Sequence, residues 1–118
     1  MKIKILFLAF VSSFCFCKSQ SCDEIIKYVK SKNSGITYYS TGSSAISQVT
    51  FYSIYDNYKT YYFAIVKFTS NYYREYIYQV GSNTGYNYSM KYMNSAGEAF
   101  WKFIHPRNKS LGCAPTFD

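Results

Sequence analysis

Residues 46–80 read ISQVTFYSIYDNYKTYYFAIVKFTSNYYREYIYQV, and this stretch decides the fold. It contains three runs in which β-branched and aromatic residues dominate and side chains alternate, which is typical of strands. The runs are 46–55, 61–69 and 75–80. They are separated by the short turn-forming pairs Asp56–Asn57 and Ser70–Asn71. Such short connections join antiparallel neighbours, so the stretch predicts three consecutive strands of an antiparallel meander.

The chain before this stretch predicts one helix and one further strand. Residues 22–31 place Ile25, Ile26 and Val29 on one helical face. Ser21 followed by Glu24 is a capping-box pattern, which predicts the start of this helix at Ser21. Gly35 is expected to close the helix, and the tyrosine-containing run 36–41 to form a strand.

The chain after this stretch predicts two short helices. Residues 83–93 are expected to form a short helix or an irregular segment. Ser95 and Glu98 form a second capping box before an apolar helical face, and Pro106 is expected to end that helix. The predicted fold is therefore α+β, an antiparallel meander of three to four strands with an N-terminal helix and two short C-terminal helices. These helices are expected to pack mostly on one face of the sheet.

The first residues have the pattern of an export signal. Lys2 and Lys4 precede an apolar run, 5–16, which is too short to span a bilayer. Cleavage after Ser19 would leave one domain, 20–118, with no stable membrane anchor. Bacterial export is then expected to make this domain a secreted or periplasmic protein. The alternative is a lipoprotein acylated at Cys22, but that cysteine lacks the apolar residue three positions before it.

Cysteine placement agrees with export. The sequence contains four cysteines, and Cys15 and Cys17 fall within the predicted signal peptide. Cys22 and Cys113 remain in the mature chain. In an oxidising compartment they are expected to form one disulfide, and the alternative is two free thiols near the ends of the chain.

The ordered motifs of the domain resemble one known family. These motifs are a serine pair before an apolar strand, a central Y-x-Y, and a closing S-x-G before an aromatic residue and an isoleucine. Together they resemble the KTSC domain, which is named for the C-terminal extension of some lysyl-tRNA synthetases. The resemblance spans about residues 43–104. It implies RNA binding, a function suggested for the family. Export, however, would separate this chain from cytoplasmic RNA. The matching positions are Ser43, Ile46, Val49, Tyr76, Tyr78, Ser95, Gly97, Phe100 and Ile104.

The sequence offers little for catalysis or metal binding. His105 is the single histidine, and its place at a predicted helix end favours a structural role. The six acidic residues are scattered, and two of them, Glu24 and Glu98, already have a capping role. A metal site needs several N, S or O ligands. We therefore expect no enzyme activity, no metal and no cofactor.

Tyrosine is the unusual component, with 15 residues in a chain of 118. Adjacent tyrosines in a strand point to opposite faces, so some of them are expected to lie on an exposed sheet face. Such rings either support strand pairing or bind a ligand. We expect an exported interaction domain that binds a protein or a glycan through this aromatic face, with nucleic acid as the alternative ligand. The candidate binding residues are Lys67, Arg74, Tyr76 and Tyr78.

Overall fold

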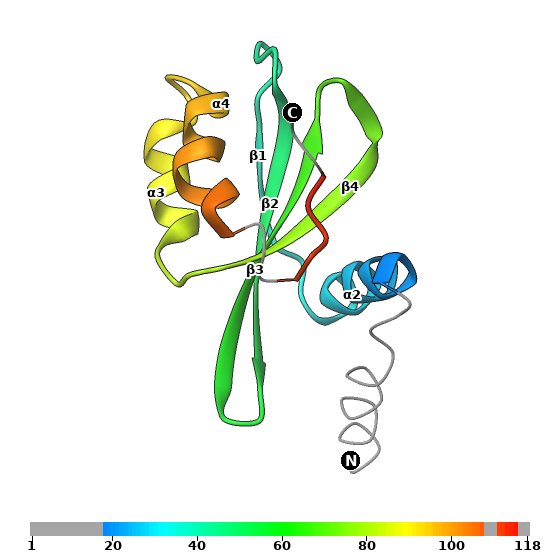
Figure 1. Cartoon of the computed structure of the whole chain (residues 1–118). Coiled ribbons are helices and arrows are strands. Elements are labelled where there is room, and N and C mark those ends of the chain that lie inside the picture. Colours follow the sequence, from blue (N-terminus) through cyan, green and yellow to red (C-terminus); the bar gives the residue numbers. More distant parts are fainter. Residues whose placement is uncertain (1–17, 108–110, 116–118) are drawn as a thin grey trace.

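The computed structural model describes residues 18–107 and 111–115, so residues 1–17 of the predicted signal peptide lie outside the described part. The chain forms a helix, a four-stranded sheet and a second group of helices (Figure 1). The elements are α2 (Lys18–Lys32), β1 (Ile36–Tyr39), β2 (Ile46–Asp56), β3 (Lys59–Phe68), β4 (Asn71–Val80), α3 (Thr84–Lys91), α4 (Ala96–Ala99), a π-helical turn (Phe100–Ile104) and a 3₁₀ turn (His105–Arg107). The predicted α+β meander is confirmed.

The sheet follows the order of the sequence, β1-β2-β3-β4, and every neighbouring pair is antiparallel. The predicted strand at residues 36–41 is β1, and the predicted segment 83–93 contains α3. None of the helices in the described part is long and apolar enough to cross a membrane.

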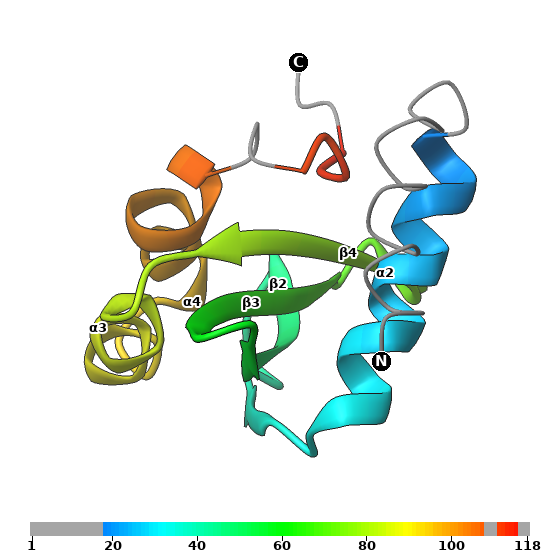
Figure 2. The same cartoon turned by 90° about the horizontal axis from the view of Figure 1, so that it is seen from below.

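Helices cover both faces of the sheet, so the prediction that they pack mostly on one face is wrong (Figure 2). The reason lies in the strands, because consecutive residues such as Ile65 and Val66, or Ile77 and Tyr78, are all buried. Consecutive strand residues point to opposite faces, so both faces of β3 and β4 are apolar and both need a cover.

Two separate cores result. The larger core lies between the sheet and the helices α3, α4 and the π-helical turn, and it includes Val49, Val66, Tyr78, Tyr88, Phe100 and Ile104. The smaller core lies between the other face and α2, and it includes Ile26, Val29, Tyr52, Ile54, Ile65, Ile77 and Cys113. Cys113 belongs to the C-terminal segment, so this segment and α2 close the same face.

Several contacts fasten α2 to the sheet. The predicted disulfide between Cys22 and Cys113 is present. The Lys30 ammonium lies 2.8 Å from the Glu75 carboxylate of β4. The Asn33 side-chain amide donates to the Ser53 carbonyl over 2.8 Å. Because these contacts join α2 to the tail, β4 and β2, the helix is part of the domain rather than an appendage.

The glycine that follows α2 is needed for this close approach. Gly35 has φ +66°, and a Cβ there would lie 2.7 Å from Cε2 of Tyr52 and 2.8 Å from Cγ2 of Thr50. Both the backbone conformation and the space therefore favour glycine, because a side chain at this position would clash with β2.

The two predicted capping boxes have different outcomes. α2 begins at Lys18, so Ser21 lies inside the helix and the predicted start was wrong. Ser95 is the N-cap of α4, since its hydroxyl accepts from the Glu98 amide over 3.2 Å. Pro106 lies within the 3₁₀ turn that ends the helical segment.

Candidate functional site

The four residues predicted to form a binding face do not lie on one exposed surface. Tyr78 is only 1% exposed, and its ring packs edge-on against Phe100 with the centroids 5.7 Å apart. Burial raises the pKa of its phenol well above the usual value. The π-helical turn covers this side of the sheet, so Tyr78 cannot contact a ligand and its assignment to a binding face was wrong. Tyr76 is half-buried, with its ring 5.5 Å from that of Phe68.

Lys67 and Arg74 lie at an irregular corner of the sheet. Val66 pairs with Tyr76 while Phe68 pairs with Asn71, so residues 72–75 bulge outward opposite Lys67. The Lys67 ammonium lies 4.6 Å from the centroid of the Tyr72 ring, and the Arg74 guanidinium 5.5 Å from that of Tyr76. We call residues 72–75 the β4 bulge. It exposes aromatic and basic groups, but at an edge and not on a sheet face.

The β2–β3 hairpin extends beyond its neighbours. β1 pairs with β2 only as far as Phe51, and β4 pairs with β3 only as far as Tyr62. Residues 53–61, which we call the hairpin tip, therefore lie beyond the paired parts of β1 and β4, and Figure 1 shows the hairpin projecting from the body of the domain. Residues 55–60 of this segment are exposed, whereas Ile54 at its base is buried in the smaller core beside α2.

The turn of the hairpin tip holds a tyrosine in an unfavourable conformation. Asn57 and Tyr58 have φ of 55° and 64°, the pattern of a type I′ turn, in which the second position is usually glycine. A non-glycine residue in this left-handed region costs about 1–2 kcal/mol. Tyr58 is 90% exposed and Tyr55 is 70% exposed. The hairpin turn therefore exposes an aromatic ring although glycine would suit the backbone better.

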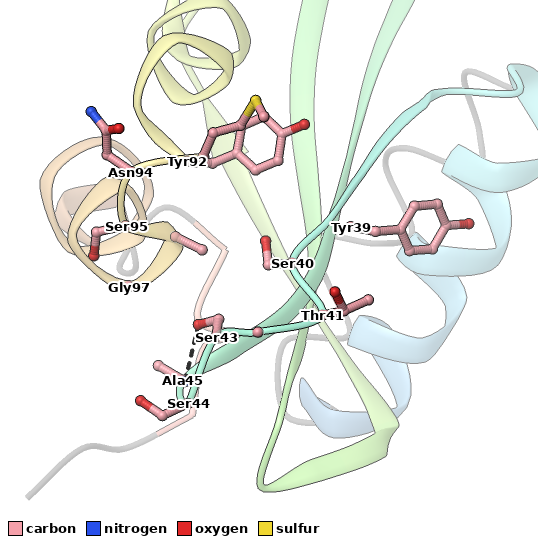
Figure 3. Close-up of a pocket in the computed structure, with 13 residues that line it drawn as sticks. Tyr39, Ser40, Thr41, Ser43, Ser44, Ala45, Tyr92, Asn94, Ser95 and Gly97 are labelled. Carbon is pink, nitrogen blue, oxygen red and sulfur yellow. Dashed lines mark hydrogen bonds between the residues drawn. The ribbon is translucent and has the colours of Figure 1, made fainter.

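A pocket lies between the β1–β2 connection, residues 40–45, and residues 92–97, which comprise the α3–α4 connection and the first two residues of α4 (Figure 3). Its volume is about 570 Å³. Figure 1 shows these two connections at the end of the sheet opposite the hairpin tip. Residues about 50 positions apart in the sequence form the two walls, as the topology brings them together.

The positions that carry the family resemblance fall into two groups. Most of them belong to the larger core, since Ile46, Val49, Tyr78, Phe100 and Ile104 are buried in it and the half-buried Tyr76 packs against it. The remaining positions, Ser43, Ser95 and Gly97, line the pocket.

The described residues contain no group of three or more His, Cys, Asp or Glu that could hold a metal ion. The His105 ring packs against Trp101 with the centroids 4.3 Å apart, in the 3₁₀ turn after the last helix. Burial is the largest cause that raises the pKa of the phenols of Tyr28, Tyr52, Tyr78 and Tyr88.

A comparison with protein-family models, curated proteins and solved structures found no match to this chain. The resemblance to the KTSC domain stays a prediction from the sequence.

Sequence reasoning missed both the hairpin tip and the pocket. Asp56–Asn57 was a visible turn signal, but the turn is centred one residue later, and its projection depends on how far β1 and β4 extend. The pocket has no local signal, because its walls come from two connections that meet only in the folded chain.

Proposed function

We propose that this chain is an exported, non-enzymatic interaction domain that contacts a protein partner through the tyrosines of the hairpin tip. The observation that carries the proposal is Tyr58, an almost fully exposed ring on a backbone conformation that favours glycine. Unfavourable conformations persist where function requires the side chain. The contact surface differs from the aromatic sheet face expected from the sequence, because both sheet faces are covered.

The composition of the hairpin tip supports a protein contact. Residues 53–61 read SIYDNYKTY, a mixture of tyrosine with small polar residues that antibody loops also use. Tyrosine supplies a large contact area with few rotatable bonds, so little entropy is lost on binding. Lys59 lies 5.5 Å from the centroid of the Tyr61 ring, and this contact helps to order the strand that leads away from the turn. A projecting, ordered hairpin fits a concave partner surface.

Two observations support export. The first is the basic and then apolar pattern of residues 2–16, which matches a signal peptide. The second is the disulfide between Cys22 and Cys113, a bond that persists in oxidising compartments.

Site-specific photo-crosslinking in the source cells tests the proposed partner. A photoreactive residue at position 58 is expected to capture one discrete partner, and the same residue at position 86 is not. Tyr86 is the matched control because it is also a tyrosine, 67% exposed, and it lies on α3. The Tyr58→Gly variant should keep its fold and lose the purified partner. Equal capture from both positions, or unchanged affinity in Tyr58→Gly, would contradict the proposal.

One feature favours nucleic acid as a second candidate ligand. The β4 bulge combines Arg74 with the exposed rings of Tyr72 and Tyr73, and Lys67 lies over Tyr72. Bases stack on such rings while cations contact phosphates. Titration of the oxidised chain with short RNA and single-stranded DNA should then show binding that weakens steeply with salt, because phosphate contacts release counterions. Absence of binding at low salt would exclude this candidate.

A further inference from the structure

A second surface, independent of the hairpin tip, has the properties of a ligand site. The pocket between the β1–β2 and α3–α4 connections has a volume of about 570 Å³, within the range of roughly 300–1,000 Å³ typical of small-ligand sites. From its chemistry we propose that this pocket binds a neutral saccharide.

The lining is polar and uncharged. Seven of its 13 residues carry a hydroxyl group, Asn94 adds a carboxamide, and no acidic, basic or histidine residue is among them. Hydroxyl and amide groups both donate and accept hydrogen bonds, which matches the hydroxyls of a sugar. An anionic ligand would call for lysine or arginine, and a cationic one for carboxylates. The lining residues are Tyr39, Ser40, Thr41, Gly42, Ser43, Ser44, Ala45, Tyr92, Met93, Asn94, Ser95, Ala96 and Gly97.

The two charged residues that flank the α3–α4 connection are paired with each other. Lys91 ends α3 and Glu98 lies in α4, so they flank the α3–α4 connection, and their charged groups are 3.3 Å apart. Each group reduces the field of the other, so the pair does not make the pocket attractive to ions of either sign.

Both walls are held in place before any ligand arrives. On one wall, the Ser43 hydroxyl accepts from the Ile46 amide over 3.0 Å, and the Thr69 amide donates to the Ala45 carbonyl over 2.9 Å. On the other wall, the Asn94 and Ser95 amides both donate to the Lys91 carbonyl, over 3.0 and 3.1 Å. A preformed site loses little conformational entropy on binding.

Several polar groups of the pocket remain available. The side chains of Thr41, Ser44 and Asn94 make no hydrogen bond to the described part of the chain, and all three residues are exposed. A ligand can therefore bind these three groups without breaking a hydrogen bond within the described part of the chain.

An aromatic ring completes the site. Tyr92 is stacked on Tyr88 with an interplanar angle of 12° and also contacts Tyr38, with 5.0 Å between centroids, so its ring has a fixed orientation. In Figure 3 the Tyr92 ring lies above Ser40, whereas the Tyr39 ring is directed away from the other lining side chains. Tyr92 is partly exposed and can pack against the C–H face of a sugar ring while the hydroxyls bind its edge.

Amide chemical shifts of the oxidised chain, titrated with neutral trisaccharides of glucose, mannose and N-acetylglucosamine, test the proposal. At least one sugar is expected to shift residues 40–45 and 92–97 selectively, with a Kd in the millimolar range or tighter. The absence of such shifts for all three sugars at about 50 mM would overturn it, since even a Kd of 1 mM means near-complete occupancy. A uronic acid trimer that binds more tightly than its neutral counterpart would overturn the neutral assignment.

Variants separate the pocket from the rest of the surface. Thr41→Ala and Asn94→Ala are each expected to weaken sugar binding about fivefold, the value of one net hydrogen bond. Thr60→Ala is the matched control, because Thr60 is also exposed but lies in the hairpin tip. Tyr58→Gly should leave sugar binding unchanged, which distinguishes failure of this site from failure of the hairpin contact. Equal affinity of Thr41→Ala, Asn94→Ala and the unmodified chain would overturn the proposal.

Discussion

At the scale of a single residue, Tyr88 illustrates how burial in the larger core affects a tyrosine. Its side chain is completely buried, and its phenol oxygen has no hydrogen-bond partner of good geometry in the described part of the chain. Burial raises its pKa to about 12, although the nearby Ser40 hydroxyl lowers it somewhat. The ring stabilises the core while the hydroxyl group is unfavourable there.

This state of Tyr88 predicts that the chain loses stability in alkaline solution. In the unfolded chain the phenol ionises near pH 10, while in the folded chain it keeps its proton to about pH 12. Between these values the unfolded state binds fewer protons, so the free energy of unfolding falls as pH rises. Below about pH 10 the contribution is fully present. Urea unfolding at a series of pH values, with phenolate absorbance, measures this slope.

Tyr88→Phe provides the variant for that experiment. It keeps the ring and removes the unpaired hydroxyl, so we expect the free energy of unfolding to rise by about 1 kcal/mol at neutral pH. It should also make the alkaline slope less steep, because one titrating group is lost. A loss of stability would show that the hydroxyl has a favourable contact. Tyr92→Phe is the comparison variant, since Tyr92 stacks on Tyr88 but is partly exposed.

For Tyr58 we expect that removal of the whole side chain does not lower the stability of the chain. Tyr58→Gly should keep or raise the free energy of unfolding by up to about 1 kcal/mol, because glycine relieves the left-handed conformation. Tyr55→Gly is the control, since Tyr55 is a strand residue that is also exposed, and glycine there should lower stability by about 1 kcal/mol. Thermal unfolding of both variants measures the difference. A large loss in Tyr58→Gly would mean that the ring supports the hairpin.

At the scale of elements, the disulfide adds a covalent link to the contacts that hold α2 on the domain. The bond joins residues 91 positions apart and links α2 to the C-terminal segment that covers the same face. Replacing both Cys22 and Cys113 by serine is expected to lower the free energy of unfolding by about 4–5 kcal/mol in the chain-entropy model. Amide exchange should then be fastest in α2 and slower in β2 and β3. Equal protection in the oxidised and double-variant chains would contradict this account.

The strands were predictable because their sequence pattern is local. Alternation and turn signals located β2, β3 and β4 to within a few residues, and Ser95 correctly marked the start of α4. The coverage of both sheet faces was also present in the sequence, as consecutive apolar residues in 63–66 and 76–78, but a half-buried sheet was expected instead. The start of α2 was wrong because a capping box at Ser21 is a local preference that the rest of the helix overrides.

The candidate sites were much less predictable than the fold. Tyr76 and Tyr78 were chosen because they are aromatic, yet an aromatic residue in a strand is equally suited to a core, and Tyr78 lies there. The exposure of Tyr58 depends on the lengths of β1 and β4, and the pocket depends on two connections that meet only after folding. Neither property is encoded by residues adjacent in the sequence.

At the scale of the whole molecule, the predicted processing can be tested directly. Mass spectrometry of the exported protein should show a chain that begins at or near Gln20, with a mass two hydrogens below that of the dithiol. The physical reason is that export exposes the leader to a signal peptidase and the cysteines to an oxidising compartment. An intact N-terminus or free thiols would contradict the proposed location.

The disulfide also determines how the domain responds to mechanical load. Cys22 and Cys113 enclose every strand and every helix after α2 in one covalent ring, and their Cα atoms are 5.8 Å apart. A pulling force applied to the chain outside this ring passes from one cysteine to the other through the sulfur–sulfur bond. The sheet carries none of that tension. A domain tethered by its ends would therefore stay folded under a load that would extend its reduced form.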